Sequence, residues 1–174
     1  MPSPEGSSVT FRRVPAGLGR ATIESFARRL QKEIAKGHPF DTLISGDAEL
    51  RRLNREFRGQ DYTTDVLSFP VELEPNHDAF SPQRRRDRRG KRRENQEHGG
   101  RFLGDIVISV GRARAQAREF GHDLEQEVRI LMLHGLLHLM GHDHETDAGA
   151  MARAEKRWRA KLGLPNGLIE RVRT

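Results

Sequence analysis

The segment VRILMLHGLLHLM, residues 128–140, is apolar on nearly every side of a helix, and it decides the fold. A helix that is apolar all round is buried rather than lying at the surface. Asp123 and Gln126 precede the segment with the spacing of a capping box, and Gly141 follows it as a typical helix-ending residue. The sequence therefore predicts a buried helix that begins after residue 123 and ends before residue 141.

Shorter apolar patterns on either side of this helix predict the remaining elements. Alternating apolar and polar residues indicate four strands, at residues 8–14, 41–45, 65–69 and 104–110. Apolar residues at helical spacing, each run followed by a glycine, indicate four more helices, at residues 23–34, 50–57, 110–120 and about 147–162. The order β, α, β, α, β, β, α, α, α predicts an α+β fold. We expect one domain over residues 1–174, with a mixed sheet of about four strands and about five helices.

Positive charge is concentrated in one segment of the chain. Residues 84–93 read RRRDRRGKRR and carry a local charge of +7, whereas the whole chain carries +6, so the rest sums to about −1. Basic residues steer a protein towards phosphate only where they are displayed. Residues 75–100, which contain this segment, have almost no apolar content and are expected to form a disordered loop. Such a charge run is most often solvated, and RNA contact is the alternative.

Cysteine is absent, so disulfides and thiolate metal ligands are excluded, and a transition-metal site must use histidine, carboxylate or water. The first residues, MPSPEGSSVT, lack the basic start and the apolar stretch of a signal peptide. No window approaches the roughly 18 apolar residues of a membrane span. We therefore expect a cytoplasmic protein with no membrane partner.

Two histidines, His134 and His138, interrupt the buried segment. Residues four apart lie on one face of a helix with Cβ atoms about 5–6 Å apart, so both imidazoles can reach one ion at about 2.0–2.1 Å. Burying several imidazoles without partners costs about 1–3 kcal/mol each, which favours a metal over core histidines satisfied by neighbouring groups. After the helix the chain can turn back, so that His144 or His142 supplies a third ligand and Asp143 or His142 a fourth.

Three strong ligands without cysteine are typical of a catalytic zinc site, in which one open position holds water. Imidazole also suits nickel or another divalent metal, and zinc, one ion per chain, is the expected ion. The spacing of His134, His138, Gly141 and His144 is that of the metzincin zinc peptidases. Those enzymes carry a glutamate general base after the first histidine, where this chain has Gly135. Because a positioned base is typically worth about 10² to 10⁴ in rate, peptidase activity is not favoured.

Three segments resemble the YbeY family of bacterial endoribonucleases. HGLLHLMGHDH, residues 134–144, matches the family signature throughout, NREFRGQDYTTDVLSFP, residues 54–70, resembles its second motif, and GDIVIS, residues 104–109, resembles a third. The resemblance covers roughly residues 9–163. The basic segment at residues 84–93 departs from the family pattern, because it lengthens a loop that is usually shorter.

The resemblance implies a zinc-dependent, single-strand-specific endoribonuclease that acts in 3′ end maturation of small-subunit ribosomal RNA and in ribosome quality control. His134, His138 and His144 match the family's metal-ligand positions, and Arg58 matches its functionally important arginine. The implied partners are ribosomal RNA and the small ribosomal subunit, with a small-subunit ribosomal protein and the GTPase Era as further partners.

Several roles in such a reaction stay open. Arg58 is expected in the last turn of its helix, where it either neutralises charge on the phosphate or is a solvated helix-end cation. His142, Asp143 and Asp147 are candidates for orienting the ligand imidazoles through their remaining N–H groups, and His142 also for acid or base. The nucleophile is water or the RNA 2′-hydroxyl. The alternatives to a nuclease are a ribosome assembly factor with a structural zinc and a metallohydrolase of another substrate, such as a peptidase.

Overall fold

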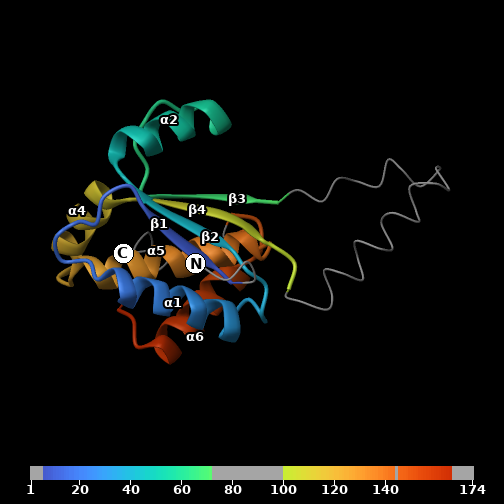
Figure 1. Cartoon of the computed structure of the whole chain (residues 1–174). Helices are drawn as coiled ribbons and strands as arrows, with labels where there is room; N and C mark the ends of the chain where they lie inside the picture. The colour runs from blue at the N-terminus through green and yellow to red at the C-terminus, as the bar shows by residue number, and fades with distance from the viewer. Residues whose placement is uncertain (1–5, 72–99, 144, 166–174) are drawn as a thin grey trace, which may run out of the picture.

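The computed structural model describes residues 6–71, 100–143 and 145–165, and these contain one four-stranded sheet (Figure 1). The strands are β1 (Ser8–Phe11), β2 (Asp41–Ser45), β3 (Val66–Pro70) and β4 (Gly104–Ser109), in the order β1-β2-β4-β3. β1, β2 and β4 run parallel, and β3 pairs with β4 in antiparallel fashion. The expected mixed sheet is therefore confirmed, with β3 as an edge strand.

Five helices lie in the described part of the chain: α1 (Arg20–Glu33), α2 (Asp47–Arg58), α4 (Val110–Phe120), α5 (Leu124–Leu139) and α6 (Ala150–Leu162). Helices α1, α5 and α6 lie on one face of the sheet and α2 lies on the opposite face (Figure 1). The glycines that the sequence marks as stop signals at 59, 121 and 163 end α2, α4 and α6 in left-handed conformations. The α+β prediction and the order of elements are confirmed.

Helix α5 is the centre of the main core. The Asp123 carboxylate accepts from the Gln126 backbone N–H at 2.8 Å, and the Gln126 side chain accepts from the Asp123 N–H at 3.1 Å, so the predicted capping box is present. The helix packs so closely on β4 that a Cβ on Gly135 would lie 2.8 Å from Cγ2 of Ile106. No helix among the described residues, α5 included, is long and apolar enough to cross a membrane.

Helix α2 packs over a smaller cluster on the other face of the sheet, formed by Leu50, Leu67 and Val107. This cluster is separate from the main core around α5. Two apolar faces on one sheet explain why β3 and β4 alternate residues that face α2 with residues that face α5.

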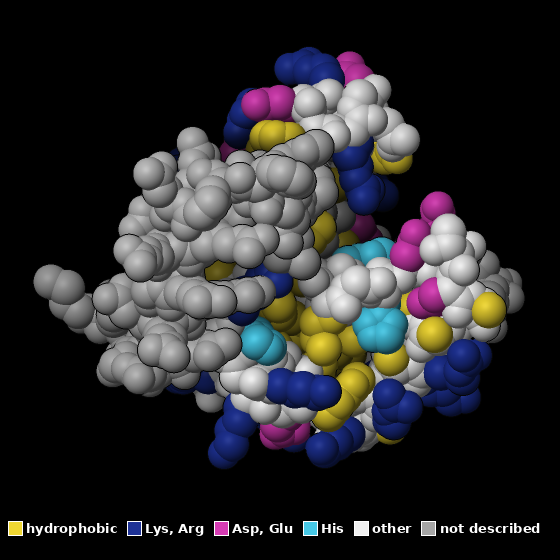
Figure 2. All heavy atoms as spheres, turned by 90° about the vertical axis from the view of Figure 1, so that its right-hand side faces the viewer, with side chains coloured by type: hydrophobic (Ala, Val, Ile, Leu, Met, Phe, Trp, Pro, Cys, Tyr) yellow, Lys and Arg dark blue, Asp and Glu magenta, His cyan; other side chains and the backbone are white. Residues whose placement is uncertain are grey.

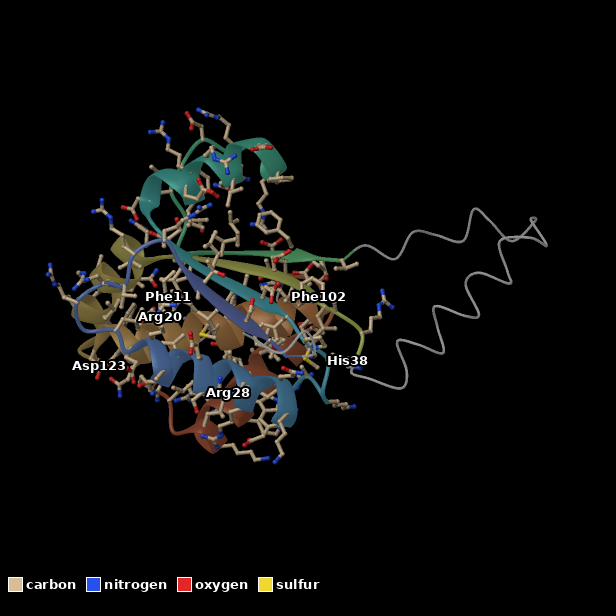
Figure 3. All side chains as sticks on the ribbon, in the orientation of Figure 1. Phe11, Arg20, Arg28, His38, Phe102 and Asp123 are labelled. Atoms are coloured by element: carbon tan, nitrogen blue, oxygen red, sulfur yellow. The ribbon has the colours of Figure 1, made fainter. Side chains whose placement is uncertain are left out.

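Strand β1 is shorter than the predicted range of 8–14. It ends at Phe11, because Arg12 and Arg13 form a bend and Pro15 has no N–H to offer to a neighbouring strand. The first residue of α1, Arg20, lies over the Phe11 ring with its guanidinium carbon 4.8 Å from the ring centroid (Figure 3). This contact ties the start of α1 to the end of β1.

The last helix begins at Ala150 rather than near residue 147. Its N-cap is Gly149, and the Asp147 carboxylate before it accepts from the backbone N–H of Gly149 at 3.1 Å and of Met151 at 2.8 Å. Gly149 has a φ of 86°, which lies outside the helical region. The predicted start was wrong by about one turn, since apolar spacing does not distinguish the residues just before an N-cap from the first helical residues.

Strands β3 and β4 are joined by a long connection. The backbone N–H of Val71 donates to the Leu103 carbonyl oxygen at 3.0 Å, so the chain leaves the sheet and re-enters it at adjacent positions. Apart from residue 100, the loop expected at residues 75–100, with its basic segment 84–93, lies outside the described residues.

Candidate active site

The side chains of His134 and His138 converge on one face of α5. Their Nε2 atoms are 3.2 Å apart and their ring centroids are 4.8 Å apart. His134 is buried and His138 is half-buried, so the pair lies where the core meets the surface. The spacing of four residues predicts this convergence on a helix.

Glu155 of α6 contacts His134 on the far side of the ring. Glu155 Oε2 lies 3.0 Å from His134 Nδ1, and both side chains are buried. Because a carboxylate only accepts hydrogen bonds, Nδ1 is the donor of this pair, and Nε2 lies on the side of His138. A carboxylate in this position fixes the orientation of the ring.

A cavity of about 410 Å³ opens in front of the two histidines. Figure 2 looks onto this side of the molecule and shows histidine side chains at the surface, below basic side chains of the α2 region. The walls of the cavity come from α2, the edge strand with the residue before it, α5 and the loop after α5. Beside the two histidines, the lining residues are Arg58, Asp65, Val66, Ser68, Pro70, Asp143 and Glu145.

Arg58 lies in the last turn of α2, just before Gly59, as predicted. Its side chain lines this cavity. Among the described residues it makes no ion pair, whereas every other arginine of α2 has a carboxylate partner. Its guanidinium is therefore available to bind an anion. The paired arginines of the helix are joined as Arg51–Asp61, Arg52–Glu49, Arg52–Glu56 and Arg55–Asp61.

The edge strand β3 lies between Arg58 and the histidines. The Ser68 hydroxyl donates to the Gly135 carbonyl oxygen at 3.1 Å, which fixes the strand to α5 one residue after His134. Alternate residues of the strand serve the two faces of the sheet: Val66, Ser68 and Pro70 line the cavity, and Leu67 and Phe69 belong to the cluster under α2.

Gly135 occupies the position at which metzincin peptidases have their glutamate, and here this position faces the sheet. A Cβ would lie 2.8 Å from Cγ2 of Ile106, which is fully buried in β4. A glutamate side chain would have to enter the core, where an unpaired carboxylate is costly. The packing of α5 on β4 therefore speaks against the peptidase alternative.

The other predicted site residues lie in the loop after α5. Asp143 lines the cavity, and its carboxylate also accepts from the Glu145 backbone N–H at 3.0 Å. The Asp147 carboxylate accepts from the Met151 N–H in the first turn of α6. His142 is half-buried and does not line the cavity. His144 lies outside the described residues. Within the described residues, which omit position 144, no group of three potential metal-ligand side chains comes together.

The histidine pair fits a zinc-type metal. Two nitrogen ligands of a tetrahedral ion, each about 2.0–2.1 Å from the metal, are about 3.3 Å apart. The two Nε2 atoms are 3.2 Å apart, and the carboxylate behind His134 is a usual partner of metal-bound histidines. The described residues can thus supply two imidazole ligands to one ion.

Glu155 is the site residue that the sequence pattern does not reveal. It lies 21 positions after His134, on a helix whose apolar stripe indicates only packing. The one signal is a single acidic residue beside that stripe, in a helix otherwise rich in basic residues. An acidic residue in such a sequence is usually solvated, so the pairing becomes visible only when α6 is packed against α5.

Comparison with known proteins identifies the family. The family model described as Endoribonuclease YbeY matches residues 17–163. The Endoribonuclease YbeY of Solibacter usitatus (strain Ellin6076) is 64% identical over 174 residues and 100% of both chains, and that of Koribacter versatilis (strain Ellin345) is 37% identical over 94% of this chain and 91% of the relative. The solution structure of TM1509 from Thermotoga maritima shares the fold with a TM-score of 0.50 at 24% identity, over 89% of this chain and 92% of that one. This chain therefore belongs to the YbeY family of endoribonucleases.

Proposed function

We propose that this chain is a zinc-dependent endoribonuclease that cuts single-stranded RNA in 3′ end maturation of small-subunit ribosomal RNA and in ribosome quality control. One observation carries the proposal: the His134–His138 pair and a guanidinium without an ion pair among the described residues, that of Arg58, line the same cavity. Family membership supports the reaction class. The resemblance of the motifs supports the ribosomal substrate and, as partners, the small subunit, one of its proteins and the GTPase Era.

His134, His138 and His144 would hold the ion, which we propose to be zinc, with nickel or another divalent metal as the alternative. When bound, zinc supplies Lewis-acid chemistry, since it polarises a phosphoryl oxygen and lowers the pKa of water. Glu155 keeps the proton of His134 on Nδ1, so that Nε2 stays available as a ligand.

Arg58 would neutralise the negative charge that develops on the phosphate. A guanidinium presents its N–H groups as a planar fork that matches phosphate oxygens. The segment after α2 is held against this helix, because the Asn54 side chain donates to the Tyr62 carbonyl oxygen at 3.0 Å. Arg58 is therefore presented from an anchored helix end rather than from a free loop.

The test combines metal analysis with RNA cleavage for the unsubstituted chain and for His134→Ala/His138→Ala. We expect about one zinc ion per chain and chelator-sensitive cutting of single-stranded but not duplex RNA, with both lost in the double variant. Stoichiometric zinc without cutting by any of the proteins would make the metal structural, and a ribosome assembly factor would then be the better interpretation.

Arg58→Ala separates charge stabilisation from metal binding. It should keep the metal and lower kcat by about 10²–10³, because it removes one stabilising group and no ligand. Arg55→Ala, one turn earlier on the same helix and already paired with Asp61, is the matched control and should retain full activity. Equal rates for Arg58→Ala and Arg55→Ala would contradict the role of Arg58.

A further inference from the structure

We propose that the ring of Phe57 is a stacking platform for a nucleobase next to the phosphate that Arg58 binds. This inference rests on the proposed function, because it takes single-stranded RNA as the substrate. Phe57 immediately precedes Arg58 at the end of α2, and 61% of its surface is exposed. A single exposed apolar residue is ordinary on a protein surface, so the argument depends on where this ring lies.

The Phe57 ring packs against the face of β3 that is turned away from the cavity. It packs edge to face with Phe69, with ring centroids 5.2 Å apart and an angle of 66° between the planes. Phe69 stands in β3 between Ser68 and Pro70, which both line the cavity. The last two residues of α2 therefore reach over the edge strand in different directions, Arg58 to the cavity and Phe57 to the outer side of its wall.

The contact with Phe69 immobilises the ring and still leaves most of it exposed. An immobilised aromatic face is what unstacked RNA bases bind, because every base has a π-face and stacking requires no particular sequence. The guanidinium of the adjacent Arg58 adds the charge that a nucleotide phosphate needs, whereas an apolar peptide would leave that charge unanswered. A duplex keeps its bases stacked inside, so the platform would also favour single strands.

A binding cycle tests the proposal with the full chain. Fluorescence anisotropy gives the Kd for a labelled single-stranded RNA and for the same ribose-phosphate chain without bases, in the His134→Ala/His138→Ala background so that no cleavage intervenes. We expect this background protein to prefer the base-bearing RNA by about tenfold, a typical effect of one stacked base. Adding Phe57→Leu, which keeps an apolar side chain against Phe69, should remove the preference, and Phe57→Tyr should keep it.

Two controls separate the ring from its surroundings. Phe120→Ala changes another phenylalanine, 42% exposed at the end of α4, and should leave the preference unchanged. Arg58→Ala should weaken both RNAs equally, because it removes a phosphate contact. Equal melting temperatures for the Phe57 variants and the background protein would show that they are folded.

The possible results distinguish a failure of the stacking platform from a failure of the proposed nuclease function. A preference that survives Phe57→Leu overturns the platform, and so does equal weakening of both RNAs by Phe57→Leu, since the ring would then only support Arg58. If Phe57→Leu removes the preference for base-bearing RNA as expected but the unsubstituted chain cuts no RNA, the proposed nuclease is refuted and the platform is retained. Absence of any binding to single-stranded RNA would refute both.

Discussion

Glu155 is 2% exposed, with one carboxylate oxygen 3.0 Å from His134 Nδ1 and the other without a hydrogen-bond partner among the described residues. A buried carboxylate that uses only part of its hydrogen-bonding capacity is expensive, so packing alone does not account for it. Its position is explained if it orients the His134 ring for a ligand role at the other nitrogen. Glu155 is then a positioning residue that acts through His134.

Glu155→Gln should lower zinc affinity about 10- to 100-fold, the usual effect of altering a carboxylate behind a metal-bound histidine. Glutamine keeps the shape and can still accept from Nδ1, but it removes the negative charge. Competition with a chromophoric chelator measures the Kd directly, without reference to activity. Glu24→Gln on the surface of α1 is the control, and identical affinities for the two variants would show that Glu155 is only a packing residue.

Gly135→Glu should cost about 3–5 kcal/mol of unfolding free energy, because it places an uncompensated charge against the core. The steric reason is the 2.8 Å approach of a Cβ to Ile106. Urea unfolding measures the loss, and Gly6→Glu, at an open position with nothing within 4 Å of its Cβ, should be nearly neutral. A Gly135→Glu protein of native stability would mean that the helix can move away from β4 and that the peptidase alternative is open again.

At the scale of elements, sequence signals between neighbouring residues predicted the helix ends well, whereas features that depend on distant residues could not be predicted. The capping box at Asp123 and the glycine stops at 59, 121 and 163 were readable because capping involves residues a few positions apart. The strand order β1-β2-β4-β3 was not, because it depends on pairing across a long connection. The histidine pair could be predicted because its members are four residues apart on one helix. The Glu155 partner of His134 and the need for a glycine at 135 could not, because they depend on α6 and β4.

The sheet carries a pair of like charges, because Asp41 and Asp105 are partners in the parallel register of β2 and β4. Burial and then the charge of Asp41 raise the pKa of Asp105. The folded chain therefore holds a proton at this carboxyl more readily than the unfolded chain, and stability falls as the pH rises through the raised pKa. The charge at Asp105 is thus destabilising at neutral pH and harmless in acid.

Asp105→Asn should raise the unfolding free energy by about 0.2–1 kcal/mol at neutral pH, the range of cross-strand pairs, and should give no gain in acid, where Asp105 is protonated. Urea unfolding at the two pH values measures this difference. Asp61→Asn is the control of opposite sign, because a hydrogen bond from Arg51 lowers the pKa of Asp61 and neutralising it should bring no stabilisation. A loss of stability for Asp105→Asn at neutral pH would contradict the assignment.

At the scale of the whole molecule, the candidate site is assembled from two layers. Helices α2 and α5 lie on opposite faces of the sheet (Figure 1). Arg58 comes from α2 and the histidines from α5, and both line one cavity beside the edge strand β3. The sequence indicates helix α2 with Arg58 and helix α5 with the histidines separately, but only the completed sheet brings these residues together. The site therefore depends on the fold as a whole, although α5 owes its position to the apolar core rather than to a metal.

Removal of the metal should lower Tm without unfolding the protein. A ligand present at about a hundredfold excess over its Kd stabilises by about 2.7 kcal/mol, which for a chain of this size is about 5–10 °C. Calorimetry with and without chelator measures the shift, and His134→Ala/His138→Ala should show none. Complete unfolding on chelation would instead make the metal part of the folding energy.

The bond from Val71 to Leu103 closes the sheet before the chain departs from it. Each doubling of a flexible loop costs only about 0.6 kcal/mol in closure entropy. A segment inserted between residues 71 and 103 should therefore change the stability of the sheet very little. The connection between β3 and β4 is thus a suitable place to insert a foreign segment. A peptide tag inserted there would follow Pro70, the last residue of β3 and part of the cavity wall, and would so attach a chosen partner close to the site.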